Sequence, residues 1–168
     1  MFKKEYLSFY LTAAIIATIL YCIPMVMFVR SADYNNTYLL FIGNFLFLIV
    51  IGAFVLFFNK RKGENASTQT MRAAGHIATV FGIVLSCLAA FIAISVFIPS
   101  IYNSGGSNTV LENAPSQTGT GKTHGLVFML FMSTIIGNLC GGSVASILIP
   151  ITARKDQTKD KKSEVLNN

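Results

Sequence analysis

The sequence predicts an all-α integral membrane protein, a bundle of four transmembrane helices with both termini in the cytoplasm. Hydrophobic residues make up 53% of the 168 residues and charged residues only 12%, which is about half the charged share of a soluble domain. Asp, Glu, Lys and Arg are absent from four long apolar stretches. A soluble chain of this length could not bury so much apolar surface.

Each apolar stretch is long enough to cross a bilayer as a helix, which takes roughly 20 residues. We place the spans at residues 9–29, 39–58, 73–99 and 125–151. The third and fourth spans are the longest, so we expect them to tilt or to project beyond the hydrocarbon. A cleaved signal peptide is a less favoured interpretation of the first span, because such apolar regions hold roughly 7–15 residues and end at a small-residue site.

Basic residues gather on one side of the predicted spans. That side holds the N-terminus, the connection between spans two and three, and the C-terminal tail; its basic residues are Lys3, Lys4, Lys60, Arg61, Lys62, Arg72, Arg154, Lys155, Lys159, Lys161 and Lys162. The other side holds only Arg30 and Lys122. The positive-inside rule therefore predicts cytoplasmic termini. Short loops and a basic cytoplasmic side are typical of small bacterial inner-membrane proteins, and we expect that location.

We divide the chain into a transmembrane domain, residues 1–153, and a basic cytoplasmic tail, residues 154–168. The tail is charged and poor in apolar residues, which predicts disorder. The longest connection, residues 100–124, is rich in Ser, Asn, Thr and Gly, a composition that favours turns. Its one apolar island, Val110-Leu111-Glu112, is expected to rest on the bundle.

Small and polar residues recur at helical spacing inside the third and fourth spans. Small side chains let helix backbones approach closely, which is how helices associate where lipid supplies no hydrophobic drive. We therefore predict that spans three and four pack together along these faces. The candidate packing or polar-core residues are Asn44, Gly82, Ser86, Asn138, Gly141 and Gly142.

Two hydrogen bonds are expected among the polar residues of the spans. Ser86 and Asn138 both sit near the middle of their spans, so we predict a bond between them. Asn44 is the strongly polar residue of the second span and should face protein rather than lipid. Tyr21 and Thr134 lie at a similar depth, and either one can reach Asn44 as its partner.

No residue pattern points to catalysis, to a cofactor or to a metal ion, so we predict that the protein is not an enzyme. Cys22, Cys87 and Cys140 each lie inside a span, where buried thiols act mainly as small hydrophobes. His76 and His124 lie near opposite membrane faces and cannot share one ligand. Hydrogen bonding at the interface is the expected role of both, with pH sensing as the alternative.

The spans hold no acidic or basic side chain at mid-depth, which argues against a proton-coupled pump. Our leading hypothesis is a non-enzymatic protein acting through helix–helix or lipid contacts, as an accessory or structural subunit. The alternative is a carrier or pore for a small neutral solute, lined by Asn44, Ser86 and Asn138. Expected partners are the bilayer and either a second copy or another membrane protein, and not nucleic acid. A polar cavity at mid-depth favours transport, and a dry packed centre favours the contact role.

Overall fold

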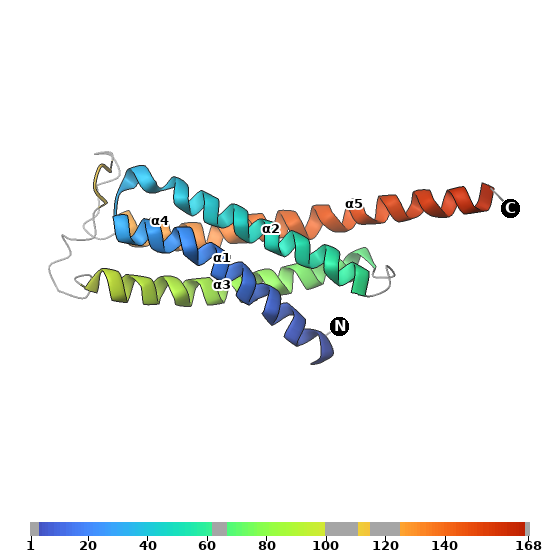
Figure 1. Cartoon of the computed structure of the whole chain (residues 1–168), viewed down its shortest axis with the longest axis horizontal. Coiled ribbons are helices and arrows are strands. Elements are labelled where there is room, and N and C mark those ends of the chain that lie inside the picture. Colours follow the sequence, from blue (N-terminus) through green and yellow to red (C-terminus); the bar gives the residue numbers. More distant parts are fainter. Residues whose placement is uncertain (1–3, 62–66, 100–110, 115–124, 167–168) are drawn as a thin grey trace.

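The structure is a computed structural model that describes residues 4–61, 67–99, 111–114 and 125–166, with backbone alone at 4, 5 and 154–166. Figure 1 shows long helices lying side by side in one elongated bundle. Four of them are long and apolar enough to cross a membrane, over Tyr6–Ser31, Tyr34–Arg61, Thr68–Phe97 and Gly125–Ala153. The predicted helical class is confirmed, and so is the number of helices long and apolar enough to span a membrane. Each predicted span lies within a helical segment or ends two residues beyond one.

Helix α1 covers Lys4–Ser31 and continues through Pro24. A short 3-10 helix, η1 (Tyr34–Asn36), leads into α2, which covers Tyr38–Arg61. The carboxylate of Asp33 accepts a hydrogen bond of 2.9 Å from the backbone N–H of Asn35, which caps the short helix. This connection brings α2 back beside α1 as an antiparallel neighbour.

Helix α3 covers Thr68–Phe97 and begins five residues before the predicted span. The hydroxyl of Ser67 accepts a bond from the N–H of Thr70 at 3.2 Å, so a polar N-cap starts the helix ahead of its apolar part. The helix ends shortly before Pro99, as expected, because proline disfavours helical backbone in the residue before it.

The last span consists of three segments that follow one another without a break. They are α4 (Gly125–Met132), a π-helical turn η5 (Ser133–Gly137) and α5 (Asn138–Leu166). In Figure 1 the end of α5 extends well beyond the other helices. The structure differs here from the prediction of a disordered tail over residues 154–168, since helix reaches Leu166. This stretch contains four lysines, and lysine has a high helix propensity.

Two helices form the centre of the contact pattern. Both α2 and α3 touch α1 on one side and α5 on the other, and they also touch each other. The predicted pairing of the third and fourth spans is confirmed by the contacts between α3 and α5. The extensive contact between α1 and α3 was not predicted.

The outside of the bundle is apolar over the length of the helices. Phe41 is 72% exposed, Val96 64% and Ile23 57%. The interior combines aromatic side chains with small ones, and Phe47, Phe58 and Tyr21 are fully buried. A surface this apolar is the arrangement expected of helices that face lipid.

The starts of α1 and α3 and the end of α2 lie at one end of the bundle, which we call the basic end after Lys60, Arg61 and Arg72. An aromatic cluster lies beneath it. The rings of Tyr6 and Phe58 meet edge to face with centroids 5.6 Å apart, and those of Tyr10 and Phe54 at 6.1 Å. Such pairs add to the energy of area burial and tie α1 to α2.

At the opposite end, the connection after α1 binds part of the long connection before α4. The N–H of Tyr34 donates to the carbonyl of Glu112 at 2.9 Å, and the N–H of Glu112 donates to the carbonyl of Ala32 at 3.0 Å. Leu111 is only 2% exposed. The expectation that this island rests on the bundle is confirmed for Leu111 and Glu112, while Val110 lies outside the described residues.

Candidate functional site

Polar side chains occupy the interior of the bundle among the apolar ones. Five of them have no exposed surface at all: Thr79, Ser86, Thr134, Asn138 and Ser146. Burying a polar group without a hydrogen bond is costly. The partners of these five side chains therefore decide what the interior can do.

Tyr21 and Thr134 join α1 to the π-helical turn. Their side-chain oxygens lie 2.8 Å apart, and the Thr134 hydroxyl donates to the carbonyl of Leu130 at 2.7 Å. A threonine hydroxyl carries one hydrogen, so Tyr21 is the donor to Thr134. The ring of Tyr21 also lies against Gly43, where a Cβ would be 2.9 Å from Cδ2 of the ring.

Asn44 of α2 faces protein, as predicted, but its partner is different. Its amide nitrogen Nδ2 donates to the hydroxyl of Ser133 at 2.9 Å. The predicted partners, Tyr21 and Thr134, bond to each other instead. The amide oxygen Oδ1 of Asn44 is buried and has no hydrogen-bond partner among the described residues. A Cβ at Gly137 would lie 2.7 Å from Cγ of this amide, so the side chain is held tightly.

The predicted bond between Ser86 and Asn138 is wrong. Ser86 donates to the hydroxyl of Thr18 at 3.4 Å, and Thr18 donates to the carbonyl of Gly82 at 3.2 Å. This part of α3 thus faces α1 rather than the last span. The amide of Asn138 is fully buried, and within the described chain neither its nitrogen nor its oxygen has a partner.

The small residues of α3 divide between two neighbours, which explains that error. Gly82 faces α1 and α2, since a Cβ there would lie 2.7 Å from the Phe47 ring and 3.9 Å from Cα of Ala14. Gly75, two turns earlier, faces Ser146 of α5. A straight stripe of small residues therefore meets different helices at different depths, because the helices cross.

Gly75 and Thr79 of α3 contact Ser146 and Gly142 of α5 in a reciprocal arrangement. Ser146 lies against Gly75, and Thr79 lies against Gly142. Each hydroxyl donates to the carbonyl of the glycine four residues earlier on its own helix, at 2.8 Å for Thr79 and 2.6 Å for Ser146. Gly142 therefore packs against α3 as predicted.

Gly141, the last of the candidate residues, faces α2 rather than α3. A Cβ there would lie 3.4 Å from Cβ of Leu48 and 3.6 Å from the carbonyl oxygen of Asn44, which is ordinary contact. Gly141 is therefore not a position of unusually close approach.

The π-helical turn was not predicted from the sequence. It carries two adjacent hydroxyls that bond to other helices, Ser133 to Asn44 and Thr134 to Tyr21. Such turns occur mostly as single bulges within α-helices and frequently at functional sites. The sequence signal for this turn is the adjacent polar pair Ser133 and Thr134 inside an apolar span. Both side chains need hydrogen-bond partners, but a regular α-helix directs neighbouring side chains about 100° apart.

The groups that carry most redox and metal chemistry are scattered in the structure. Cys22 and Cys87 are half-buried and Cys140 is exposed, and none of the three forms a disulfide. Among the described residues, no three of His, Cys, Asp and Glu gather into a group that could hold a metal ion. His76 is half-buried in α3, and His124 lies outside the described residues.

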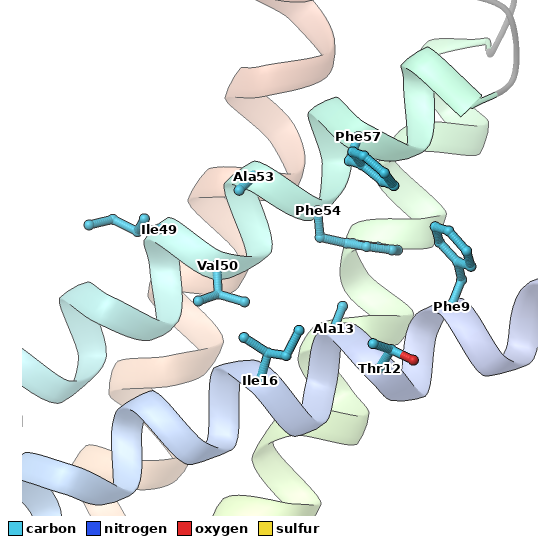
Figure 2. A pocket seen from close by; sticks show the side chains of 9 residues that line it. All are labelled: Phe9, Thr12, Ala13, Ile16, Ile49, Val50, Ala53, Phe54 and Phe57. Carbon is cyan, nitrogen blue, oxygen red and sulfur yellow. The ribbon is translucent and has the colours of Figure 1, made fainter.

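A groove on the flank of the bundle, between α1 and α2, was also not predicted. Its volume is about 440 Å³, and Figure 2 shows side chains from both helices converging on it. The residues that line it are Phe9, Thr12, Ala13, Ile16, Ile49, Val50, Ala53, Phe54 and Phe57. It is open to the outside, since Ile16 and Ile49 are each 47% exposed and Phe57 is 59% exposed.

A cationic side chain lies over the wall of this groove. The guanidinium carbon of Arg61 is 3.9 Å from the centroid of the Phe9 ring, within the range of a cation–π interaction. Phe9 also stacks on Phe57 across the two helices, with centroids 6.2 Å apart and an interplanar angle of 12°. The groove therefore approaches the basic end of the bundle.

The fold and site define a helical bundle with four helices able to span a membrane, a tightly packed polar interior and an apolar flank groove. Comparison of the chain with protein-family models, with curated proteins and with solved structures gives no match in any of the three.

Proposed function

We propose that this chain is a multi-pass membrane protein with both termini in the cytoplasm. The apolar surface of the four long helices supports insertion into the bilayer. The basic end, where α2 ends and α3 begins, carries Lys60, Arg61 and Arg72, whereas Arg30 lies at the opposite end over the Phe97 ring at 5.7 Å. This asymmetry supports a cytoplasmic basic end in the inner membrane of a bacterium.

The protein acts, in this proposal, through contacts along its flank, as a non-enzymatic accessory or structural subunit. One observation carries the proposal. Contacts at Gly75, Gly82 and Gly142 are too close to admit a Cβ, while the groove of about 440 Å³ lies on the outside and is apolar. Interior packing of this kind suits a scaffold, and an open groove suits the binding of a lipid or a partner helix.

The test uses a photoreactive amino acid at Ala53, which lines the groove, in cells that express the full chain. A matched control places the same amino acid at Val84, which is 53% exposed on α3. The proposal expects a discrete crosslinked product, protein or lipid, from position 53 and not from position 84. Identical, diffuse labelling from both positions would contradict it.

A carrier or pore for a small neutral solute is the second candidate, and one observation favours it. The buried amide of Asn138 and the amide oxygen of Asn44 have no partner among the described residues, so they have hydrogen-bonding capacity to offer a polar solute or water. Proteoliposomes loaded with urea or glycerol test this candidate. Release faster than from empty vesicles, and lost in Asn138→Leu, would favour transport over the contact role.

A further inference from the structure

The groove between α1 and α2 is suited to hydrocarbon and to little else. Eight of its nine lining residues are apolar, and the ninth, Thr12, already donates its hydroxyl to the carbonyl of Ser8 at 2.8 Å. A volume of about 440 Å³ falls within the roughly 300–1,000 Å³ of small-molecule sites. A polar ligand would find no free hydrogen-bond donor along these walls, whereas an acyl chain needs none.

The shape of the groove follows from the sizes of the side chains around it. Ala13 and Ala53 contribute only methyl groups to the lining, and the other lining residues are larger. The stacked rings of Phe9 and Phe57 cross from α1 to α2. A chain lying in the groove would contact these rings and run along the helices away from the basic end.

The basic end supplies the complementary charge for a headgroup. Lys60 and Arg61 follow Phe57 by three and four residues, about one helical turn, and both are exposed. The contact between the guanidinium group of Arg61 and the Phe9 ring at 3.9 Å holds this cation beside the groove. A guanidinium group donates hydrogen bonds in a fork that matches phosphate oxygens.

We infer that this groove binds one acyl chain of an anionic phospholipid whose phosphate is held by Lys60 and Arg61. The inference rests on the proposal that α1 and α2 face lipid. It goes further by naming the lipid class and the residues that select it. A zwitterionic lipid would fill the groove equally well but would bring no net negative charge to the two cations.

The chain contains no tryptophan, so a single introduced tryptophan reports on its own surroundings. Phe57→Trp places this reporter in the groove wall, and Leu148→Trp on α5 is the matched control. The two native side chains are 59% and 56% exposed, and both precede the end of their span at Arg61 or Ala153 by about one turn. Each variant is reconstituted into vesicles with a minor fraction of brominated phosphatidylglycerol or brominated phosphatidylcholine.

The inference expects brominated phosphatidylglycerol to quench the reporter at position 57 more strongly than brominated phosphatidylcholine does. The reporter at position 148 should be quenched equally by both. Replacing Lys60 and Arg61 by Gln in the Phe57→Trp background should lower the preference about fivefold per residue. Ala53→Phe keeps both charges but fills the groove, so it should abolish the preference for phosphatidylglycerol. Circular dichroism confirms that each variant remains helical.

Three results would overturn the inference. In the first, the reporter at position 57 shows no preference for the anionic lipid; in the second, the preference survives both the charge and the groove substitutions. Alternatively, neither lipid quenches it while both quench the reporter at position 148; another protein or a second copy then covers the groove, and the flank-contact function survives. If neither lipid quenches the reporter at position 57 or at position 148, the membrane proposal itself is contradicted.

Discussion

Ser146 of α5 occupies the space in front of Gly75 of α3, so a Cβ at position 75 would lie 2.8 Å from Cβ of Ser146. The hydroxyl of Ser146 does not cross to α3 but bonds within its own helix to Gly142. Thr79 repeats the arrangement toward Gly142 in the other direction. Close packing rather than interhelical hydrogen bonding therefore holds α3 against α5.

Gly75→Ala and Gly142→Ala should each destabilise the bundle, because the new methyl group has no space. Inserting a methyl into a packed interior costs about 1–3 kcal/mol. The measurement is the free energy of unfolding in mixed micelles titrated with dodecyl sulfate. Gly141→Ala is the matched control on the same helix, since its Cβ would make an ordinary contact at 3.4 Å. Equal stability of all three variants would show that α3 and α5 are not packed this closely.

Gly82→Ala should destabilise through Phe47, whose ring would lie 2.7 Å from the new Cβ. Gly82→Leu should do so more severely and loosen α3 from α1 and α2. Phe47→Leu shortens the opposing side chain, so the double variant Gly82→Ala, Phe47→Leu should recover part of the loss. Residues in contact show coupling energies of about 0.5–3 kcal/mol. Strictly additive effects would mean that the two side chains do not meet.

Tyr21→Phe removes the donor to Thr134 and keeps the aromatic ring that packs on Gly43. Interhelical hydrogen bonds in membrane proteins contribute on average about 0.6 kcal/mol and at most about 1.7 kcal/mol, and we expect a loss in that range. Tyr38→Phe is the control, because Tyr38 is 54% exposed. Both variants are compared by thermal unfolding in detergent. If Tyr38→Phe lowers stability as much as Tyr21→Phe does, the bond between Tyr21 and Thr134 does not stabilise the bundle.

The sequence predicts the long apolar helices well, their neighbours only in part, and the individual contacts poorly. Apolar length and the absence of charge determine which segments cross, and small residues such as Gly75 and Gly142 mark where backbones can meet. Small residues do not determine which helix packs against them. Because the helices cross, Gly75 of α3 contacts Ser146 of α5, whereas Gly82 of α3 contacts Phe47 of α2.

The partners of Asn44 and Ser86 were mispredicted for a related reason. The π-helical turn inserts an extra residue per turn at Ser133–Gly137, which rotates the following residues relative to a regular helix. Residues at the same depth in the bundle therefore did not point toward each other. The flank groove was missed because it depends on the relative placement of Ala13 and Ala53, which lie forty residues apart on helices with different tilts.

Leu111→Ala should detach the middle of the long connection from the bundle without unfolding the helices. Leu111 is 2% exposed, and the backbone bonds of Glu112 to Ala32 and Tyr34 depend on its position. Hydrogen exchange at the amides of Tyr34 and Glu112 should therefore speed up, while exchange within α3 stays unchanged. Glu112→Ala is the control, because its side chain is exposed and its backbone bonds survive.

Asn138→Leu should leave the stability unchanged or raise it, which is unusual for a fully buried polar residue. Its amide nitrogen and oxygen have no partner among the described residues, and an unsatisfied buried amide costs about 1–3 kcal/mol. Leucine has the same number of side-chain heavy atoms and the same branching, and it carries no such cost. Asn44→Leu is the contrast, since it removes the bond to Ser133 and should destabilise. A clear loss of stability in Asn138→Leu would mean that the Asn138 amide binds water or a solute in the membrane, and would favour the transport alternative.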